Sequence, residues 1–183
     1  MNWSELGRAL ATTDNTVRRY SDILEDTFMV RQLLPWHENM SKRQVKAPKA
    51  YIRDSGILHT LLEIADLPHL VRHPKVGASW EGFCIDEIAR ALGARNRECH
   101  FWGTHSGAEL DLLVVRGEQR RAFEIKRTTA PQVTPSMRIA LRDLHLERLD
   151  VVHSGDRSFP LTEQIHALAW RDMRISCSNH DLI

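Results

Sequence analysis

The hydrophobic pattern along the chain predicts alternating helices and strands. Near the N-terminus, apolar residues recur at helical spacing in two short segments, and each segment follows a residue that can cap a helix. The apolar run over residues 28–34 ends at Pro35 and favours a strand. Two short helices followed by strands are the outline of a winged helix-turn-helix. We therefore expect a small winged-helix-like unit over residues 1–56.

The rest of the pattern predicts a larger α/β domain over residues 70–172. A connecting helix over residues 57–69 precedes this domain, and a polar tail over residues 173–183 follows it. The expected elements of the domain are a helix over 79–92, strands over 98–102, 109–116 and 119–126, a helix over 136–147, a strand over 148–153 and a helix over 162–168. The first three strands should form an antiparallel meander, and the helix after them should cross over to a parallel strand.

Composition argues against several classes of protein. Of the 183 residues, 42% are hydrophobic and 27% are charged, so a disordered, collagen-like or coiled-coil chain is not expected. A formal net charge of +1 argues against a histone-like basic protein. Neither a membrane-spanning apolar run nor a secretory signal is visible. The three cysteines are widely spaced and suggest neither disulfides nor a zinc site, so we expect a cytoplasmic protein with no membrane partner.

The most informative stretch is a predicted β-hairpin over residues 109–126. If residues 117–118 form a two-residue turn, Asp111 faces Glu124 across the strands. Opposed carboxylates repel each other, and burial by neighbouring helices increases the cost. Either one carboxyl group takes up a proton, or a cation such as Mg²⁺ lies between the two. Lys126, on the same face, would then hold a nucleophilic water or stabilise charge on a phosphate oxygen.

Two of these features have plainer interpretations. The charged face of the hairpin could simply be solvated, with Glu109 and Lys126 forming a surface ion pair of little energetic weight. Glu81, in the helix over 79–92, lies either at the edge of a face that meets the sheet or in a first turn where it favours the helix dipole. The opposite face of the hairpin is expected to be the core face, and its members are Leu110, Leu112, Val114, Phe123 and Ile125.

The order of several motifs resembles the PD-(D/E)XK nuclease superfamily, with Asp111 and Glu124-Ile125-Lys126 preceded by a helix that bears Glu81. More closely, about residues 4–172 resemble a domain of unknown function that follows the ATPase domain in predicted bacterial and archaeal AAA-type ATPases. The motifs that carry this second resemblance are Trp80-Glu81-Gly82-Phe83, Phe101-Trp102, Gly107-Ala108-Glu109-Leu110-Asp111, Phe123-Glu124-Ile125-Lys126 and Lys49-Ala50-Tyr51-Ile52-Arg53-Asp54-Ser55-Gly56.

The resemblance implies a restriction-endonuclease-like α/β fold with a mixed sheet flanked by helices. It implies that Asp111 and Glu124 are ligands of Mg²⁺ or Mn²⁺. It also implies that Lys126 is the catalytic lysine and that Glu81 assists as a further ligand. Activity is not implied, because such domains have inactive relatives. The pattern Gly-x-x-x-x-Gly-Lys-Ser/Thr is absent from the sequence, so no ATP site is expected.

Basic residues outside the hairpin are candidates for contact with nucleic acid, although a solvated surface or a docking face for an ATPase would also explain them. The candidates are Arg18, Arg19, Lys42, Arg43, Lys46 and Arg127. The leading hypothesis is a metal-dependent nuclease-like module that acts on or binds nucleic acid. The alternative is a non-catalytic nucleic-acid-binding or protein-assembly module that partners an ATPase.

Overall fold

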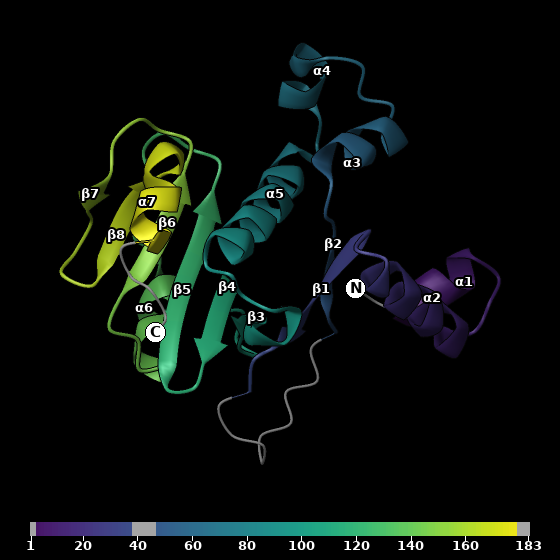
Figure 1. Ribbon diagram of the computed structural model, residues 1–183, viewed down its shortest axis with the longest axis horizontal. Helices are drawn as coiled ribbons and strands as arrows, with labels where there is room; N and C mark the ends of the chain where they lie inside the picture. Colours follow the sequence, from purple (N-terminus) through teal and green to yellow (C-terminus); the bar gives the residue numbers. More distant parts are fainter. Residues whose placement is uncertain (1–2, 38–46, 179–183) are drawn as a thin grey trace.

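In a computed structural model of the protein, which describes residues 3–37 and 47–178, the strands form one eight-stranded sheet with the order β2-β1-β3-β4-β5-β6-β8-β7 (Figure 1). The strand bounds are β1 (Val30–Pro35), β2 (Lys49–Ile52), β3 (Cys99–Gly103), β4 (Glu109–Arg116), β5 (Gln119–Lys126), β6 (Leu149–His153), β7 (Phe159–Pro160) and β8 (Ile165–Ala169).

Both the meander and the crossover predicted from the sequence are present. Strands β3, β4 and β5 pair in antiparallel fashion, and β6 lies parallel to β5 after a crossover through a helix. β1 pairs with β2 in antiparallel fashion and with β3 in parallel fashion, so the strands that follow the N-terminal helices extend the main sheet. The expected α/β class, with a mixed sheet flanked by helices, is therefore confirmed.

Helices cover both faces of the sheet, with α5 and α7 on one face and α6 on the other (Figure 1). The α-helix bounds are α1 (Trp3–Ala9), α2 (Asp14–Asp26), α3 (Ser55–Leu61), α4 (Leu67–Arg72), α5 (Val76–Ala91), α6 (Pro135–Asp143) and α7 (Met173–Ser178). Two short 3₁₀ helices span Asn96–Glu98 and Trp170–Asp172. Within the described residues, no helix has the length and apolar character required to cross a membrane.

Each face of the sheet has its own hydrophobic core. The core beneath α5 and α7 includes Leu33, Ile85, Ile88, Leu112 and Phe123. The core beneath α6 includes Leu110, Leu113, Met137, Leu149 and Val151. Both faces are covered, and β4 at the centre of the sheet accordingly contains an unbroken apolar run over residues 112–115.

The helix predicted over residues 162–168 is wrong, because this segment contains strand β8. Ile165 and Leu168 are three residues apart, which would place them on one side of a helix. In the structure they lie in the two different cores, as residues at odd spacing in a strand do. The hydroxyl of Thr162 accepts a hydrogen bond from the Ile165 N–H at 3.0 Å and completes the turn before β8.

The segment predicted to be a polar tail begins instead with helix α7. Met173 and Cys177, one turn apart on this helix, are buried in the same core as α5. The apolar spacing is confined to a single turn, which is too short to stand out from a polar sequence. Packing against α5, rather than intrinsic propensity, therefore explains this helix.

A buried ion-pair cluster joins α5 to the N-terminal strands. Asp86 on α5 is 4% exposed, and its Oδ1 accepts from Arg31 Nη2 at 2.8 Å and from Arg53 Nε at 2.9 Å. Arg31, on β1, is itself buried, and Arg90 approaches the other oxygen of Asp86 at 3.3 Å. Since the guanidinium of Arg31 cannot lose its proton, this cluster needs the carboxylate to remain in place.

Substitution of Asp86 by Ala should therefore lower the free energy of unfolding by about 3 kcal/mol or more, because it leaves buried arginine charge unpaired. Urea denaturation followed by circular dichroism measures this loss. Asp156→Ala provides the control, because Asp156 forms an exposed ion pair with Arg171 and should change stability by no more than about 0.5 kcal/mol. Similar losses for both variants would contradict a supporting role for the Asp86 cluster.

Candidate functional site

The hairpin of β4 and β5 has the register predicted from its sequence. Ladder pairs run from Arg116↔Gln119 to Leu112↔Phe123, so residues 117–118 form the turn. Gly117 has a φ of +60°, the conformation that the first central position of a type II′ turn requires. The turn therefore sets which residues of the two strands lie opposite one another.

Strand β4 contains a β-bulge at Asp111 and Leu112. The register between β3 and β4 shifts by one residue between His100 and Trp102, so that Asp111 and Leu112 together oppose a single residue of β3. Leu112 consequently lies in the core beneath α5, whereas Leu110 lies in the core beneath α6. The prediction that these two leucines share a face is wrong, since strict alternation fails at the bulge.

The two central carboxylates are buried and use their oxygens differently. Asp111 Oδ2 accepts a hydrogen bond from the backbone N–H of Ile125 at 2.9 Å, which attaches this side chain to β5. Glu124 Oε1 pairs with Lys126 Nζ at 2.6 Å. Glu124 Oε2 is buried and has no hydrogen-bond partner among the described residues. The plainer interpretation of the hairpin paired Lys126 with Glu109; in the structure Lys126 contacts Glu124, and Glu109 contacts Lys49.

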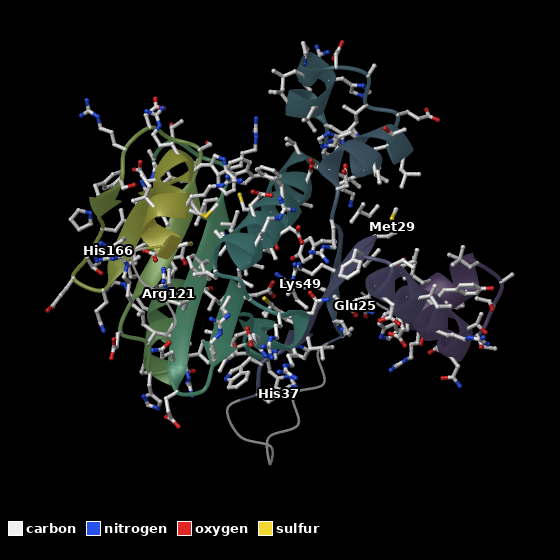
Figure 2. The ribbon with its side chains drawn as sticks, in the orientation of Figure 1. Glu25, Met29, His37, Lys49, Arg121 and His166 are labelled. Carbon is white, nitrogen blue, oxygen red and sulfur yellow. The ribbon has the colours of Figure 1, made fainter. Side chains whose placement is uncertain are left out.

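A second lysine joins the site from strand β2. Lys49 Nζ lies 3.4 Å from Glu81 Oε1 and 3.5 Å from Asp111 Oδ1, and it also forms an ion pair with Glu109. Figure 2 shows Lys49 near the middle of the molecule, between the central strands and the N-terminal helices. We refer to four residues as the carboxylate cluster: Glu81, Glu109, Asp111 and Glu124.

Tyr51 fixes the position of Glu81. Its hydroxyl donates a hydrogen bond to Glu81 Oε1 at 2.5 Å. The ring of Tyr51 lies against the backbone of Gly82, where an added Cβ would be 3.0 Å from Tyr51 Cδ1. The absence of a side chain at residue 82 therefore allows the tyrosine to approach α5 and to hold the carboxylate.

Burial and mutual repulsion shift the pKa values of this site. Desolvation, followed by the charges of Glu124 and Glu81, raises the pKa of Asp111 to about 7. Burial also raises the pKa of Glu124 above its usual range. Burial alone would lower the pKa of Lys49, but the neighbouring carboxylates outweigh it and keep the ammonium charged.

Positive charge in the site falls short of the negative charge. Four carboxylates and the two ammonium groups of Lys49 and Lys126 leave a formal charge of −2 when all are ionised. The raised pKa of Asp111 indicates that a proton can reduce this charge near neutral pH. A divalent cation would neutralise it completely.

The donor set fits a hard divalent cation in kind. Carboxylate oxygens are the ligands that Mg²⁺ prefers. Oε2 of Glu124, which has no hydrogen-bond partner among the described residues, can serve as such a ligand. Within residues 3–37 and 47–178, however, no three His, Cys, Asp or Glu side chains form a ready-made metal-binding group. A magnesium site in proteins commonly uses only one or two carboxylates together with water and substrate oxygens, so two carboxylates such as Asp111 and Glu124 suffice in number.

One member of the carboxylate cluster, Glu81, lines a cleft of about 650 Å³ together with Lys49. Tyr51 also lines this cleft, as do Glu5 and Leu6 of α1. The N-terminal helices therefore help to shape the approach to the cluster. A substrate that reached Glu81 through this cleft would also pass α1.

Three of the six basic residues considered for nucleic-acid contact lie in the part of the chain that the structure describes. Arg18 and Arg19 are exposed on α2, and the guanidinium of Arg18 lies 5.5 Å from the ring centroid of Trp3. Arg127 is exposed and lines a separate cavity of about 300 Å³. The other three candidates, Lys42, Arg43 and Lys46, lie outside the described residues.

Sequence reasoning missed the role of Lys49 and Tyr51. Lys49 stands in a stretch without acidic residues, which suggested a basic surface rather than a partner for carboxylates. The contact depends on β2 lying at the edge of the sheet beside β1, and no spacing in the sequence gives that arrangement. The alternation of Lys49 and Tyr51 is the only local signal, since it places both on one face of a strand.

Substitution of Asp111 by Asn should stabilise the metal-free protein above about pH 7 by about 2 kcal/mol, because the charged carboxylate is costly to bury. The native state holds a proton on Asp111 that the unfolded state loses near pH 4, so wild-type stability falls as pH rises from about 4 to about 7. Thermal melting across this range, with a chelator present, measures the difference between the two proteins.

The gain from Asp111→Asn should disappear below about pH 4, where the wild-type carboxyl group is protonated in both states. Asp156→Asn, at an exposed position, serves as the matched control and should show no such dependence. A difference between wild type and Asp111→Asn that is constant with pH would contradict the raised pKa.

Comparison with known proteins finds similarity along most of the chain. Residues 1–67 match a domain of unknown function, DUF8612, and residues 76–173 match a second, DUF4143. Two curated relatives, the uncharacterized protein Mb2031c of Mycobacterium bovis and the uncharacterized protein Rv2008c of Mycobacterium tuberculosis, are each 49% identical over 165 residues. The match covers 90% of this chain but 37% of each relative, so the chain spans little more than a third of their length. No solved structure matches. Since the second family model covers more than half of its residues, the chain belongs to the DUF4143 family.

Proposed function

We propose that this protein is a metal-dependent, nuclease-like module that cleaves phosphodiester bonds in nucleic acid. The observation that carries the proposal is the pair of buried carboxylates on adjacent strands, with one oxygen of Glu124 unpartnered and a lysine beside it. Such an arrangement is costly unless a proton or a cation offsets the buried charge. The resemblance of Asp111 and Glu124-Ile125-Lys126 to the PD-(D/E)XK nuclease superfamily supports the same assignment.

In this function, Asp111 and Glu124 hold Mg²⁺ or Mn²⁺, and Glu81 assists from helix α5. The bound ion supplies Lewis acidity toward a phosphate oxygen and its associated water. The hydrogen bond from the Ile125 N–H keeps Asp111 in one orientation. Tyr51 does the same for Glu81 through its hydroxyl. The residues are thus positioned before substrate arrives, which lowers the reorganisation needed in the reaction.

Lys126 orients the attacking water and stabilises negative charge that develops on the phosphate. Its ammonium is half-buried, and Glu124 keeps its pKa above the ordinary value although burial opposes this. A protonated lysine at this position serves as a donor rather than as a base. Attack on phosphorus then leaves a 5′-phosphate and a 3′-hydroxyl, as the superfamily resemblance suggests.

A second candidate function is a non-catalytic module that binds nucleic acid or assembles with an ATPase. One observation favours it: Lys49 already contacts three of the four carboxylates and supplies positive charge without a metal ion. The resemblance to domains that follow an AAA-type ATPase agrees with either function. The two differ in whether the site binds a divalent cation and cleaves.

The test is cleavage of end-labelled single- and double-stranded DNA and RNA in the presence of Mg²⁺ or Mn²⁺. Wild-type protein should cleave at least one of these substrates, and Asp111→Asn and Lys126→Met should each reduce the rate by about 100-fold or more, because each removes a charge that acts on the transition state. A chelator should abolish cleavage.

Two matched variants control for preparation and folding. Asp156→Asn and Lys75→Met make the same chemical changes at exposed positions and should cleave at the wild-type rate. Absence of metal-dependent cleavage of all four substrates would remove the enzymatic function in favour of the non-catalytic module. Cleavage that persists in both site variants would indicate a contaminating nuclease.

A further inference from the structure

We propose that Lys49 is the resident counter-ion of the carboxylate cluster and competes with the divalent cation, so that metal loading requires its ammonium to leave Asp111 and Glu81. This inference rests on the proposed function, because it concerns the same cation site. It assigns a role to a residue of the N-terminal region, outside the motif of the β4–β5 hairpin.

The contacts of Lys49 place it where a shared cation would lie. Its partners come from two elements: Glu81 belongs to α5, and Glu109 and Asp111 belong to β4. The strand that carries Lys49 is a third element. A single ammonium group therefore bridges helix and sheet, which is also what a bridging metal ion would do.

Competition follows from how Asp111 uses its two oxygens. Oδ2 accepts the backbone hydrogen bond from Ile125 at 2.9 Å. The other oxygen, Oδ1, is therefore the one best placed to bind a cation, and it is the oxygen that Lys49 approaches at 3.5 Å. Two cations close to one carboxylate oxygen repel each other, so binding of one disfavours the other.

Lys126 does not compete in this way. It pairs with Oε1 of Glu124, and the other oxygen of Glu124 stays unpartnered. A cation can therefore use Glu124 without displacing Lys126. The two lysines of the site therefore differ. Lys126 leaves Oε2 of Glu124 accessible to a metal ion, whereas Lys49 lies against Oδ1 of Asp111.

Lys49 has a route out of the cluster. Its side chain is 22% exposed and lines the cleft of about 650 Å³. Among the described strands, β2 lies at the edge of the sheet and pairs only with β1, so a change in the side chain or in this strand does not require the central strands to separate. Inside the cluster the ammonium also lies 5.5 Å from the ring centroid of Phe101, a cation–π contact.

The experiment is calorimetric titration of the full chain with MnCl₂ near pH 7.5, comparing wild type with Lys49→Met. Loss of Lys49 should raise the affinity for Mn²⁺ by about tenfold or more, because a competing positive charge about 4 Å or less from the ligands is removed. Lys49→Arg, which keeps the charge, and the surface control Lys75→Met should bind as wild type does. Asp111→Asn should bind weakly in every background.

Each outcome decides the inference and the proposed function separately. Tighter binding by Lys49→Met supports competition. If wild type binds Mn²⁺ and Lys49→Met binds it with equal or lower affinity, the competition is overturned. The proposed metal-dependent function is then unaffected. Binding by Lys49→Met but not by wild type supports competition and removes metal-dependent activity from the natural chain. No binding by either protein overturns both. Lys49→Gln, with thermal melting of each variant, replaces Lys49→Met if the latter does not fold.

Discussion

Water cannot fully solvate the carboxylates of Asp111 and Glu124, and this shortage of solvation governs the arrangement around the β4–β5 hairpin. The two side chains are 8% and 5% exposed. Buried charge of one sign costs several kcal/mol unless hydrogen bonds or opposite charges offset it. The amide of Ile125 and the ammonium groups of Lys49 and Lys126 each offset part of this cost. Together they do not remove the whole desolvation cost, because Oε2 of Glu124 has no hydrogen-bond partner among the described residues.

Asp86 meets the same physical problem with a different result. Three arginines surround its carboxylate, two of them at 2.9 Å or less, and both of its oxygens have partners. Such a group has nothing left to offer a ligand, so its role is to join α5 to the N-terminal strands. The protein thus contains two kinds of buried acid. One is saturated with partners and structural, and the other is incompletely paired and chemically available.

Local rules predicted those parts of the molecule that depend on neighbours in the sequence. Gly117 fixed the turn, and the turn fixed the hairpin register, which matches the prediction from Arg116↔Gln119 to Leu112↔Phe123. The prediction failed where tertiary packing decides. Strand β8 is recognisable only because Ile165 and Leu168 enter different cores, and the bulge that separates Leu110 from Leu112 arises from pairing with β3. Lys49 could not be placed, because its contacts depend on how an edge strand lies against a distant helix.

Gly82 shows how a residue without chemistry constrains the composition of helix α5. A glycine inside a helix destabilises it by about 1 kcal/mol relative to alanine, yet alanine here would press its methyl group on the aromatic ring that abuts this turn. Relief of that clash would move the ring of Tyr51 and weaken its hydrogen bond to Glu81. Helix α5 is therefore less stable than it would be with alanine at residue 82. This glycine directly follows Glu81, whose orientation depends on it.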